Sequence, residues 1–262
     1  MRWETGRRSG NVVNMRGKGA ALGGGGMFVM ALVVYLLGGN PMPYLMEGVS
    51  RTVQNHSAQS ALPPEQEAEQ IDFVSAVLGS TEDVWAARFQ AHGATYEQPQ
   101  LVLFTGGIQS ACGSASAAMG PFYCPYDQKI YLDLGFFQEL QDRHNAPGDF
   151  ARAYVIAHEV GHHVQDLTGQ LTTSRKDSVA TELQADCLAG IWAHDAGSRY
   201  NLIEEGDIDE ALNAATQIGD DTLQKQQQGY VVPDSFTHGS SAQRYAAFKK
   251  GYENGNLKAC EK

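Results

Sequence analysis

Two histidines, His158 and His162, enclose a glutamate, Glu159, in the pattern H-E-x-x-H. If this stretch is helical, residues four apart lie on one face, so both imidazoles can point at a single metal ion. Glu159 lies one position along and can reach the same point, where it could deprotonate a metal-activated water. His163 points about 100° away around such a helix, which indicates packing rather than metal binding. The pattern therefore predicts a metal centre at His158 and His162, with Glu159 as its catalytic base.

A second pair of acids with helical spacing, Glu182 and Asp186, follows 20 residues after His162. Catalytic zinc commonly takes three protein ligands, and two histidines with one glutamate are an established set. We therefore expect Glu182 to be the third ligand and Asp186 to accept a hydrogen bond from a ligand histidine. The alternative is that both acids lie on a solvated helix face. The mostly apolar residues between Val179 and Trp192 argue against it, because buried carboxylates need a partner.

Zinc, one ion per chain, is the cofactor expected for this set of ligands. It lowers the pKa of a bound water to about 7, so that a glutamate can remove the proton and the hydroxide can attack a peptide carbonyl. The developing oxyanion needs a donor, and His238, in a polar loop ahead of the last helix, is the candidate. Tyr230 and Arg244 are further candidates for support of the transition state. These residues predict a zinc peptidase whose partner is a polypeptide substrate.

Two other functions would use some of the same residues. A non-catalytic binding or chaperone-like module could keep zinc for its fold alone, but a structural site needs no base and normally has a fourth protein ligand. Two histidines and one carboxylate could also bind iron for oxygen chemistry. Metal analysis, together with the substitution Glu159→Gln, distinguishes these alternatives.

The charge of the 262-residue chain is negative overall, at -11, and it is unevenly spread. Residues 1–46 carry five basic residues and one acid, whereas the remainder carries 14 basic and 29 acidic residues. An acidic body repels phosphates, so nucleic acid is not an expected partner. Hydrophobic residues make up 42% of the chain, which is enough for the core of one ordinary domain.

An uncharged stretch, residues 19–46, follows the basic residues and contains the apolar run MFVMALVVYLL. The stretch is long enough to cross a bilayer, and the positive-inside rule places the N-terminus in the cytoplasm. A cleaved signal peptide and a buried core helix are the alternatives. No A-x-A-like cleavage site follows closely, and a basic, glycine-rich leader is unusual before a core helix. We expect a single-pass protein of the bacterial inner membrane, with its catalytic domain in the periplasm or otherwise outside the cytoplasm.

The chain divides into four parts on this basis. A basic cytoplasmic leader, residues 1–18, precedes the transmembrane anchor region, 19–46. A Ser/Gln-rich linker, 47–64, ends in two prolines. The rest, 65–262, is predicted to be one metallopeptidase domain of α+β type, with a small sheet followed by helices.

Within that domain the pattern changes from helical to extended and back. Two helices are expected first, one over Glu65–Leu78 and a second that begins at Thr81, a residue type that caps helices well. The runs LVLF at 101–104 and KIYLDL at 129–134 predict strands. From Asp149 onward the pattern is helical almost to the end of the chain.

Four cysteines, Cys112, Cys124, Cys187 and Cys260, all lie after the apolar run. An even number of cysteines is typical of disulfides in an oxidising compartment. The sequence leaves three pairings open. The short separation of Cys112 and Cys124, with glycines and a proline between them, suggests a closed loop, which leaves Cys187 for Cys260. Free, buried cysteines are the alternative.

Longer strings around these residues resemble a bacterial family of neutral zinc metallopeptidases nearly end to end. The strings are MRWETGRRSGNV, ACGSASAAMGPFYCPYDQKIYLDLGFF, YVIAHEVGHHVQ, ELQADCLAGIWAH and DSFTHGSSAQR. The resemblance implies a zincin-like fold of the gluzincin type, with the three metal ligands and the base named above. In related gluzincins the substrate pairs as an added strand with a sheet edge above the metal helix. By analogy that edge would come from the segment around Gly120–Cys124 or from Leu101–Phe104.

Overall fold

The computed structural model describes residues 1–16, 63–172, 174 and 177–261. Among these residues the main sheet has four strands, all from the N-terminal part of the chain. The strand order is β1-β2-β6-β5. The first three strands are parallel, and β5 runs antiparallel to β6. The strands are β1 (Val12–Asn14), β2 (Gln100–Phe104), β5 (Phe122–Cys124) and β6 (Lys129–Asp133). The two strands predicted at 101–104 and 129–134 are therefore confirmed.

The two faces of this sheet bury different sets of side chains. Leu101 and Leu103 of β2 lie in the main core with the helices, whereas Val102 and Phe104 face a smaller cluster on the other side. This alternation follows from the two-residue period of a strand. A hairpin of β3 (Gly107–Ser110) and β4 (Gly113–Ser116) lies next to the smaller cluster, and its Ile108 packs there.

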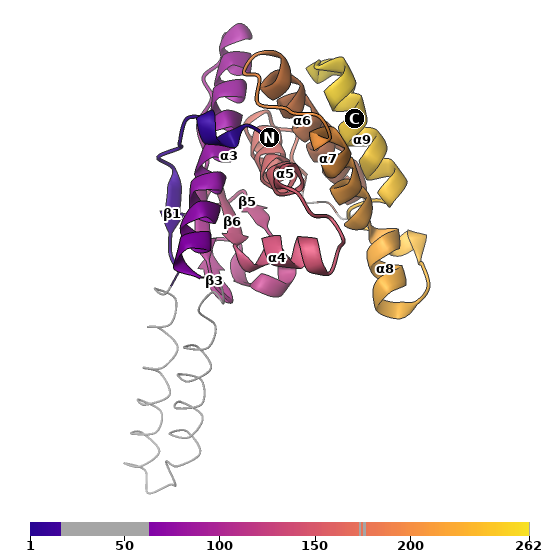
Figure 1. Cartoon of the computed structure of the whole chain (residues 1–262). Coiled ribbons are helices and arrows are strands. Elements are labelled where there is room, and N and C mark those ends of the chain that lie inside the picture. The colour runs from indigo at the N-terminus through magenta and orange to yellow at the C-terminus, as the bar shows by residue number, and fades with distance from the viewer. Residues whose placement is uncertain (17–62, 173, 175–176, 262) are drawn as a thin grey trace, which may run out of the picture.

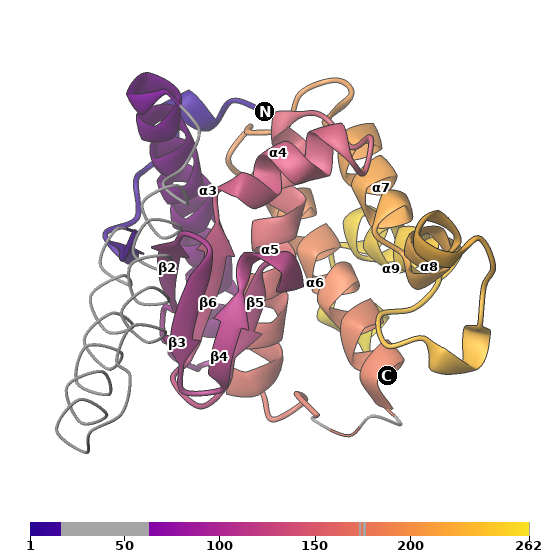
Figure 2. The ribbon, with the colours of Figure 1, turned by 90° about the horizontal axis from the view of Figure 1, so that it is seen from below.

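Seven α-helices surround and extend the sheet within the described residues. They are α3 (Pro64–Ala91), α4 (Gly135–Asp142), α5 (Asp149–Leu167), α6 (Ser178–Ser198), α7 (Asp207–Gln217), α8 (Asp220–Gln228) and α9 (Ser241–Asn254). Figure 2 shows α5 between the sheet and the helices α6, α7 and α9. The predicted α+β class, a small sheet followed by helices, agrees with this arrangement.

The helix α3 is one continuous helix where the sequence suggested two. Thr81 was expected to cap a second helix, but it is buried inside the continuous helix, as is Gly79. Thr81 donates its hydroxyl to the carbonyl of Leu78 instead of capping a new helix. At Gly79 an added Cβ would lie 2.6 Å from the carbonyl oxygen of Arg7, so the glycine is required by close approach of the N-terminal segment.

The first 14 residues belong to the same folded body as the later helices. The strand β1 pairs with β2, and Arg7 and Arg8 form ion pairs with Glu82 and Asp72 of α3. The α-ammonium group of Met1 lies 2.9 Å from both carboxylate oxygens of Asp149 and 3.1 Å from Asp207. Figure 1 shows this segment running along α3 and reaching the start of α5.

These contacts correct the predicted membrane topology. No helix in the described ranges is both long and apolar enough to cross a bilayer. The predicted anchor, 19–46, and most of the linker, 47–64, lie outside the described residues. A single crossing would also put residues 1–14 and the rest of the domain on opposite sides of a membrane, whereas they pack together. The transmembrane helix in the predicted fold class and the single-pass inner-membrane location are both wrong on this ground.

Two disulfides close the pairs that the spacing of the cysteines suggested. Cys112 bonds to Cys124 and connects the β3–β4 hairpin to β5. Cys187 of α6 bonds to Cys260 in the short helix η6 (Leu257–Cys260), which fastens the C-terminal residues to α6. Such crosslinks are typical of proteins that fold in an oxidising compartment.

Candidate metal centre

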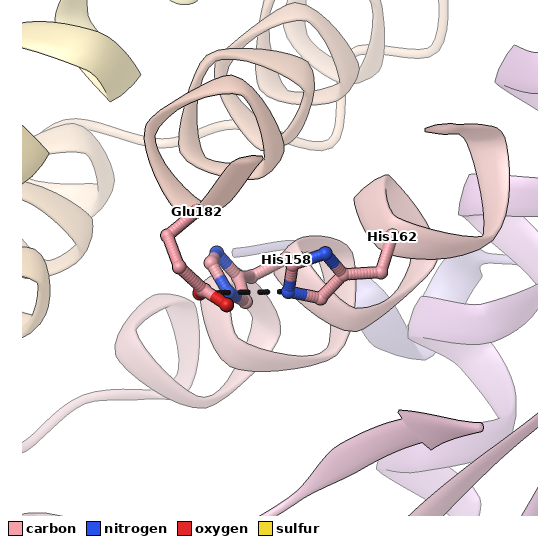
Figure 3. Close-up of side chains that lie close together, drawn as sticks. All are labelled: His158, His162 and Glu182. Carbon is pink, nitrogen blue, oxygen red and sulfur yellow. Dashed lines mark hydrogen bonds and ion pairs between the residues drawn. The ribbon is translucent and has the colours of Figure 1, made fainter. Parts of the chain in front are cut away.

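The three predicted metal ligands meet where α5 and α6 lie side by side. His158 and His162 come from α5 and Glu182 from α6, and their ligand atoms all lie within 4.8 Å of one another (Figure 3). Gly161 permits the close approach, because an added Cβ there would lie 2.9 Å from the carbonyl oxygen of Ala185 on α6. The four-residue spacing in H-E-x-x-H places the two histidines on one face of α5. Glu182 joins them only because α6 passes close to α5.

The two distances from Glu182 lie near the spacing of ligands around a tetrahedral zinc ion, one within that range and the other slightly shorter. His158 Nε2 lies 3.1 Å and His162 Nε2 lies 3.5 Å from Glu182 Oε2. Ligands at about 2.0–2.2 Å from a tetrahedral zinc are separated from one another by roughly 3.3–3.6 Å. The ligand chemistry also fits, since two imidazoles and one carboxylate are a known catalytic set that leaves a fourth position open.

Both ligand imidazoles are oriented through their other nitrogen. His158 Nδ1 lies 2.8 Å from Asp186 Oδ1, as expected from the sequence. His162 Nδ1 lies 2.9 Å from Oε1 of Gln165, which is fully buried. An Nδ1–H donated to an oxygen leaves Nε2 as the nitrogen that faces the metal position, and it also restrains the ring.

A buried arginine contacts Asp186, the carboxylate that orients His158. Arg244 of α9 donates from Nε to Asp186 Oδ2 and from Nη2 to Asp186 Oδ1, each at 2.9 Å. The Tyr154 hydroxyl donates to the same Asp186 Oδ1 and lies 3.1 Å from the guanidinium. Asp186 thus has three partners and links α9 to the histidine that it orients.

The charges at this site perturb one another strongly. Burial would lower the pKa of His158, but the carboxylates of Asp186 and Glu182 outweigh it and raise that pKa to about 10. Burial would raise the pKa of Glu182, but His162 and His158 outweigh it and hold that pKa well below its ordinary value. An electron-rich cluster that attracts protons this strongly also attracts a divalent cation.

Glu159 and His238 line the same cavity as the three ligands. The cavity has a volume of about 560 Å³ and lies between β5 with the segment before it and the helices α5 and α6. Glu159 is 7% exposed. The predicted base, the predicted oxyanion donor and the predicted ligands therefore all line one cavity, which a substrate could occupy.

A carboxylate that the sequence did not single out orients His238. Asp220, at the start of α8, lies 3.1 Å from His238 Nδ1. Its Oδ2 accepts the backbone N–H groups of Thr237, His238 and Gly239. Burial would raise the pKa of Asp220, but these hydrogen bonds, chiefly that of the His238 side chain, hold it below its ordinary value.

The other two candidates for transition-state support lie elsewhere. Tyr230 is 62% exposed, and it is not among the described residues that line the cavity. Arg244 borders the cavity but directs its guanidinium at Asp186, which in turn contacts His158.

Sequence reasoning missed Gln165 and Asp220. Gln165 lies three residues after His162, a helical spacing that could have indicated it, whereas nothing local connects Asp220 to His238, 18 residues away.

A second acidic cluster within the described residues already has a cation. Asp149, Asp207 and Glu210 bring their carboxylates together at the starts of α5 and α7. The α-ammonium of Met1 contacts the first two, and Glu210 accepts the backbone N–H of Phe150. Asp149 therefore binds the α-ammonium of Met1.

The fold and the site define a class: an α+β protein in which two histidines and one glutamate, from two helices, form a group that could hold a metal ion. The chain belongs to the family described as "putative neutral zinc metallopeptidase", whose profile matches residues 1–262. This confirms the resemblance drawn from the sequence strings.

Relatives of known sequence share most of the chain. The uncharacterized protein YpfJ of Escherichia coli K12 is 44% identical over 284 aligned positions, covering 99% of this chain and 98% of that protein. The uncharacterized protein Rv2575 of Mycobacterium tuberculosis H37Rv is 43% identical over 183 positions, covering 63% and 62%. No solved structure gives a significant match to the chain.

Proposed function

We propose that the protein is a zinc-dependent endopeptidase that hydrolyses peptide bonds with a metal-activated water. The observation that carries the proposal is the convergence of three potential ligand atoms, all within 4.8 Å of one another, on a cavity that Glu159 also lines. A purely structural zinc site would need no such base and no open cavity. One zinc per chain is expected.

Zinc, when bound, supplies a Lewis acid and a water of lowered pKa. The chain's own contribution is proton transfer. Glu159 accepts a proton from the attacking water and gives it to the leaving amine as the peptide bond breaks. Its nearly complete burial keeps bulk water from competing for that proton.

His238 is proposed to donate a hydrogen bond to the oxyanion that forms at the scissile carbonyl. Asp220 and the hydroxyl of Thr237, which lies 2.9 Å from the same ring nitrogen, engage Nδ1. Nε2 then faces the substrate, and it donates to the oxyanion when the imidazole carries a proton on both nitrogens. The side chain of His238 is about half exposed, so it can adjust to a bound peptide.

The edge strand β5 is the proposed docking site for an extended polypeptide. Of the two segments suggested by analogy, 101–104 forms β2, which is flanked by β1 and β6 and has no edge to offer. The segment Gly120–Cys124 contains β5, at the end of the sheet, and four of its residues line the cavity. A substrate strand added there would place its carbonyls beside the metal ligands.

The test compares the full chain with the variants Glu159→Gln and Glu182→Ala. Metal content is measured by elemental analysis, and cleavage by mass spectrometry of an unfolded protein such as casein. We expect one zinc in the wild type and in Glu159→Gln, loss of zinc in Glu182→Ala, and cleavage by the wild type alone. Zinc without cleavage would support a non-catalytic binding module instead, and bound iron would contradict the proposal.

A further inference from the structure

His163 follows a metal ligand directly, yet its side chain points away from the metal toward the sheet. It is 1% exposed. Its Nε2 lies 2.6 Å from the carbonyl oxygen of Glu97, which can only accept, so Nε2 carries the proton. Its Nδ1 lies 3.1 Å from the hydroxyl of Tyr123 on β5. Nδ1 can therefore only accept, and the single proton of the Tyr123 hydroxyl can go either to it or to a second acceptor.

Asp166 makes the second connection between α5 and β5. The Tyr123 hydroxyl donates to Asp166 Oδ2 at 2.7 Å. Asp166 follows His163 by three residues, which places both side chains on the same face of α5. The ring of Tyr123 also packs edge-on against the ring of His163, with centroids 5.4 Å apart. We call these three residues the Tyr123 clamp.

The edge strand needs such a connection. Its pairing with β6 extends over only three residues, Phe122 to Cys124. A strand this short is weakly held by main-chain hydrogen bonds alone. The Cys112–Cys124 disulfide fastens one end of β5 to the hairpin but not to the metal helix. In the described part of the chain, the Tyr123 clamp ties β5 to the helix that carries His158 and His162, through the hydrogen bond to Asp166 and the packing of the His163 ring.

We infer that the Tyr123 clamp positions β5 relative to the metal ligands, so that a polypeptide paired with β5 presents its scissile carbonyl to the catalytic site. Tyr123, His163 and Asp166 are thus positioning residues, and they do not touch the reacting atoms. The inference rests on the proposed endopeptidase function and on β5 as the docking strand. Misplacement by a fraction of an ångström to 1 Å is enough to cost much of the rate of such a reaction.

The experiment compares Tyr123→Phe with the matched control Tyr126→Phe, in the full-length zinc-loaded protein. Tyr126 is a nearby tyrosine that is 80% exposed. Zinc content, KM and kcat for casein-derived peptides, and hydrogen exchange of the amides of 122–124 are measured. Tyr123→Phe is expected to keep one zinc, raise KM about 10-fold through the lost hydrogen bond to the Asp166 carboxylate, and speed exchange in β5. Tyr126→Phe is expected to behave as the wild type.

A graded pair at Asp166 keeps the inference testable if Tyr123→Phe folds poorly. Asp166→Asn retains an acceptor oxygen for the Tyr123 hydroxyl and should raise KM less than Asp166→Ala does. Wild-type KM and wild-type exchange in Tyr123→Phe, or equal effects of the two Asp166 variants, would overturn the clamp. If the wild type cleaves nothing, the proposed function and the substrate role both fail. Faster hydrogen exchange of the β5 amides in Tyr123→Phe would then still show that Tyr123 fastens β5 to α5, independently of any peptidase activity.

Discussion

Asp186 holds His158 from below, with Oδ1 2.8 Å from the histidine Nδ1, while its Oδ2 accepts a hydrogen bond from Arg244. The carboxylate is fully buried. A metal ligand, its orienting acid and a buried cation from the last long helix are therefore coupled. The integrity of the metal centre depends on α9 as well as on α5 and α6.

The substitution Asp186→Asn is expected to weaken zinc binding by about 10- to 100-fold, because His158 loses its charged partner. It should also lower the free energy of unfolding by about 3–5 kcal/mol, because Arg244 is left buried without its carboxylate. Competition with a chromophoric chelator and denaturant titration measure the two effects. The matched control is Asp195→Asn, on the same helix, which breaks the buried pair between Arg88 and Asp195. It should destabilise the protein and leave zinc affinity unchanged; equal loss of zinc in both variants would contradict the assigned role of Asp186.

Zinc affinity is expected to fall as pH is lowered. In the metal-free protein the neighbouring carboxylates raise the pKa of His158 to about 10, so the imidazole is protonated below that pH. Zinc binds only the neutral ring, and binding must therefore release a proton. Calorimetric titration in buffers of different ionisation enthalpy measures the release, with Glu182→Ala as a blank. Zinc binding without proton release near neutral pH would show that His158 is neutral before the metal arrives.

Asp220→Asn is expected to lower kcat/KM about 10-fold while zinc content stays the same. The reason is that His238 loses the acid that engages its Nδ1, a hydrogen bond to a charged group. The double variant Asp220→Asn/His238→Gln should be no worse than His238→Gln alone, because Asp220 acts through His238. Additive losses in the double variant would mean that Asp220 serves the fold and not the histidine.

Adding two residues, Gly-Ser, before Met1 is expected to lower the free energy of unfolding by about 1.5–3 kcal/mol, the range for a hydrogen bond to a charged group. The extension removes the α-ammonium from Asp149 and Asp207. Burial would lower the pKa of this amine, but the two carboxylates outweigh it and raise it above 8.0. Its contribution is thus fully present below about pH 8 and is lost as pH rises through the raised pKa.

Thermal unfolding of the wild type and the extended chain, from about pH 7 to about pH 10, measures this effect. The two stabilities should converge at the alkaline end. The control carries the same two residues after Lys262. A constant difference across this pH range would exclude the ammonium as the cause.

Local sequence patterns predicted which side chains lie together at the candidate metal centre. The i, i+4 spacing of His158 with His162, and of Glu182 with Asp186, depends only on the geometry of one helical turn. The strands at 101–104 and 129–134 were predictable as short runs rich in apolar and aromatic residues between turn residues. The sequence left three cysteine pairings open, and the short separation of Cys112 and Cys124 favoured the pairing that the structure has. Each of these predictions depends only on residue types and on their spacing along the chain.

The predictions that failed concerned segments whose partners are distant in the chain. Thr81 resembled the cap of a second helix, but α3 continues through it, and Gly79 in the same helix makes room for the N-terminal segment, more than 70 residues earlier in the chain. The basic residues Arg7 and Arg8 resembled a cytoplasmic leader but pair with acids of α3. Charge and hydropathy along the chain cannot distinguish a cation that faces a membrane from one that faces a distant carboxylate.

The sequence by itself determined which residues can bind a metal, because ligand type and helical spacing are local properties. The tertiary structure alone decided that Arg244 supports Asp186, that Asp220 orients His238, and that Tyr123 connects β5 to the metal helix. These contacts form only when elements far apart in the chain pack together, and the direction of a side chain is set by that packing. The packing of the N-terminal segment against β2 and α3 is likewise a property of the tertiary structure alone.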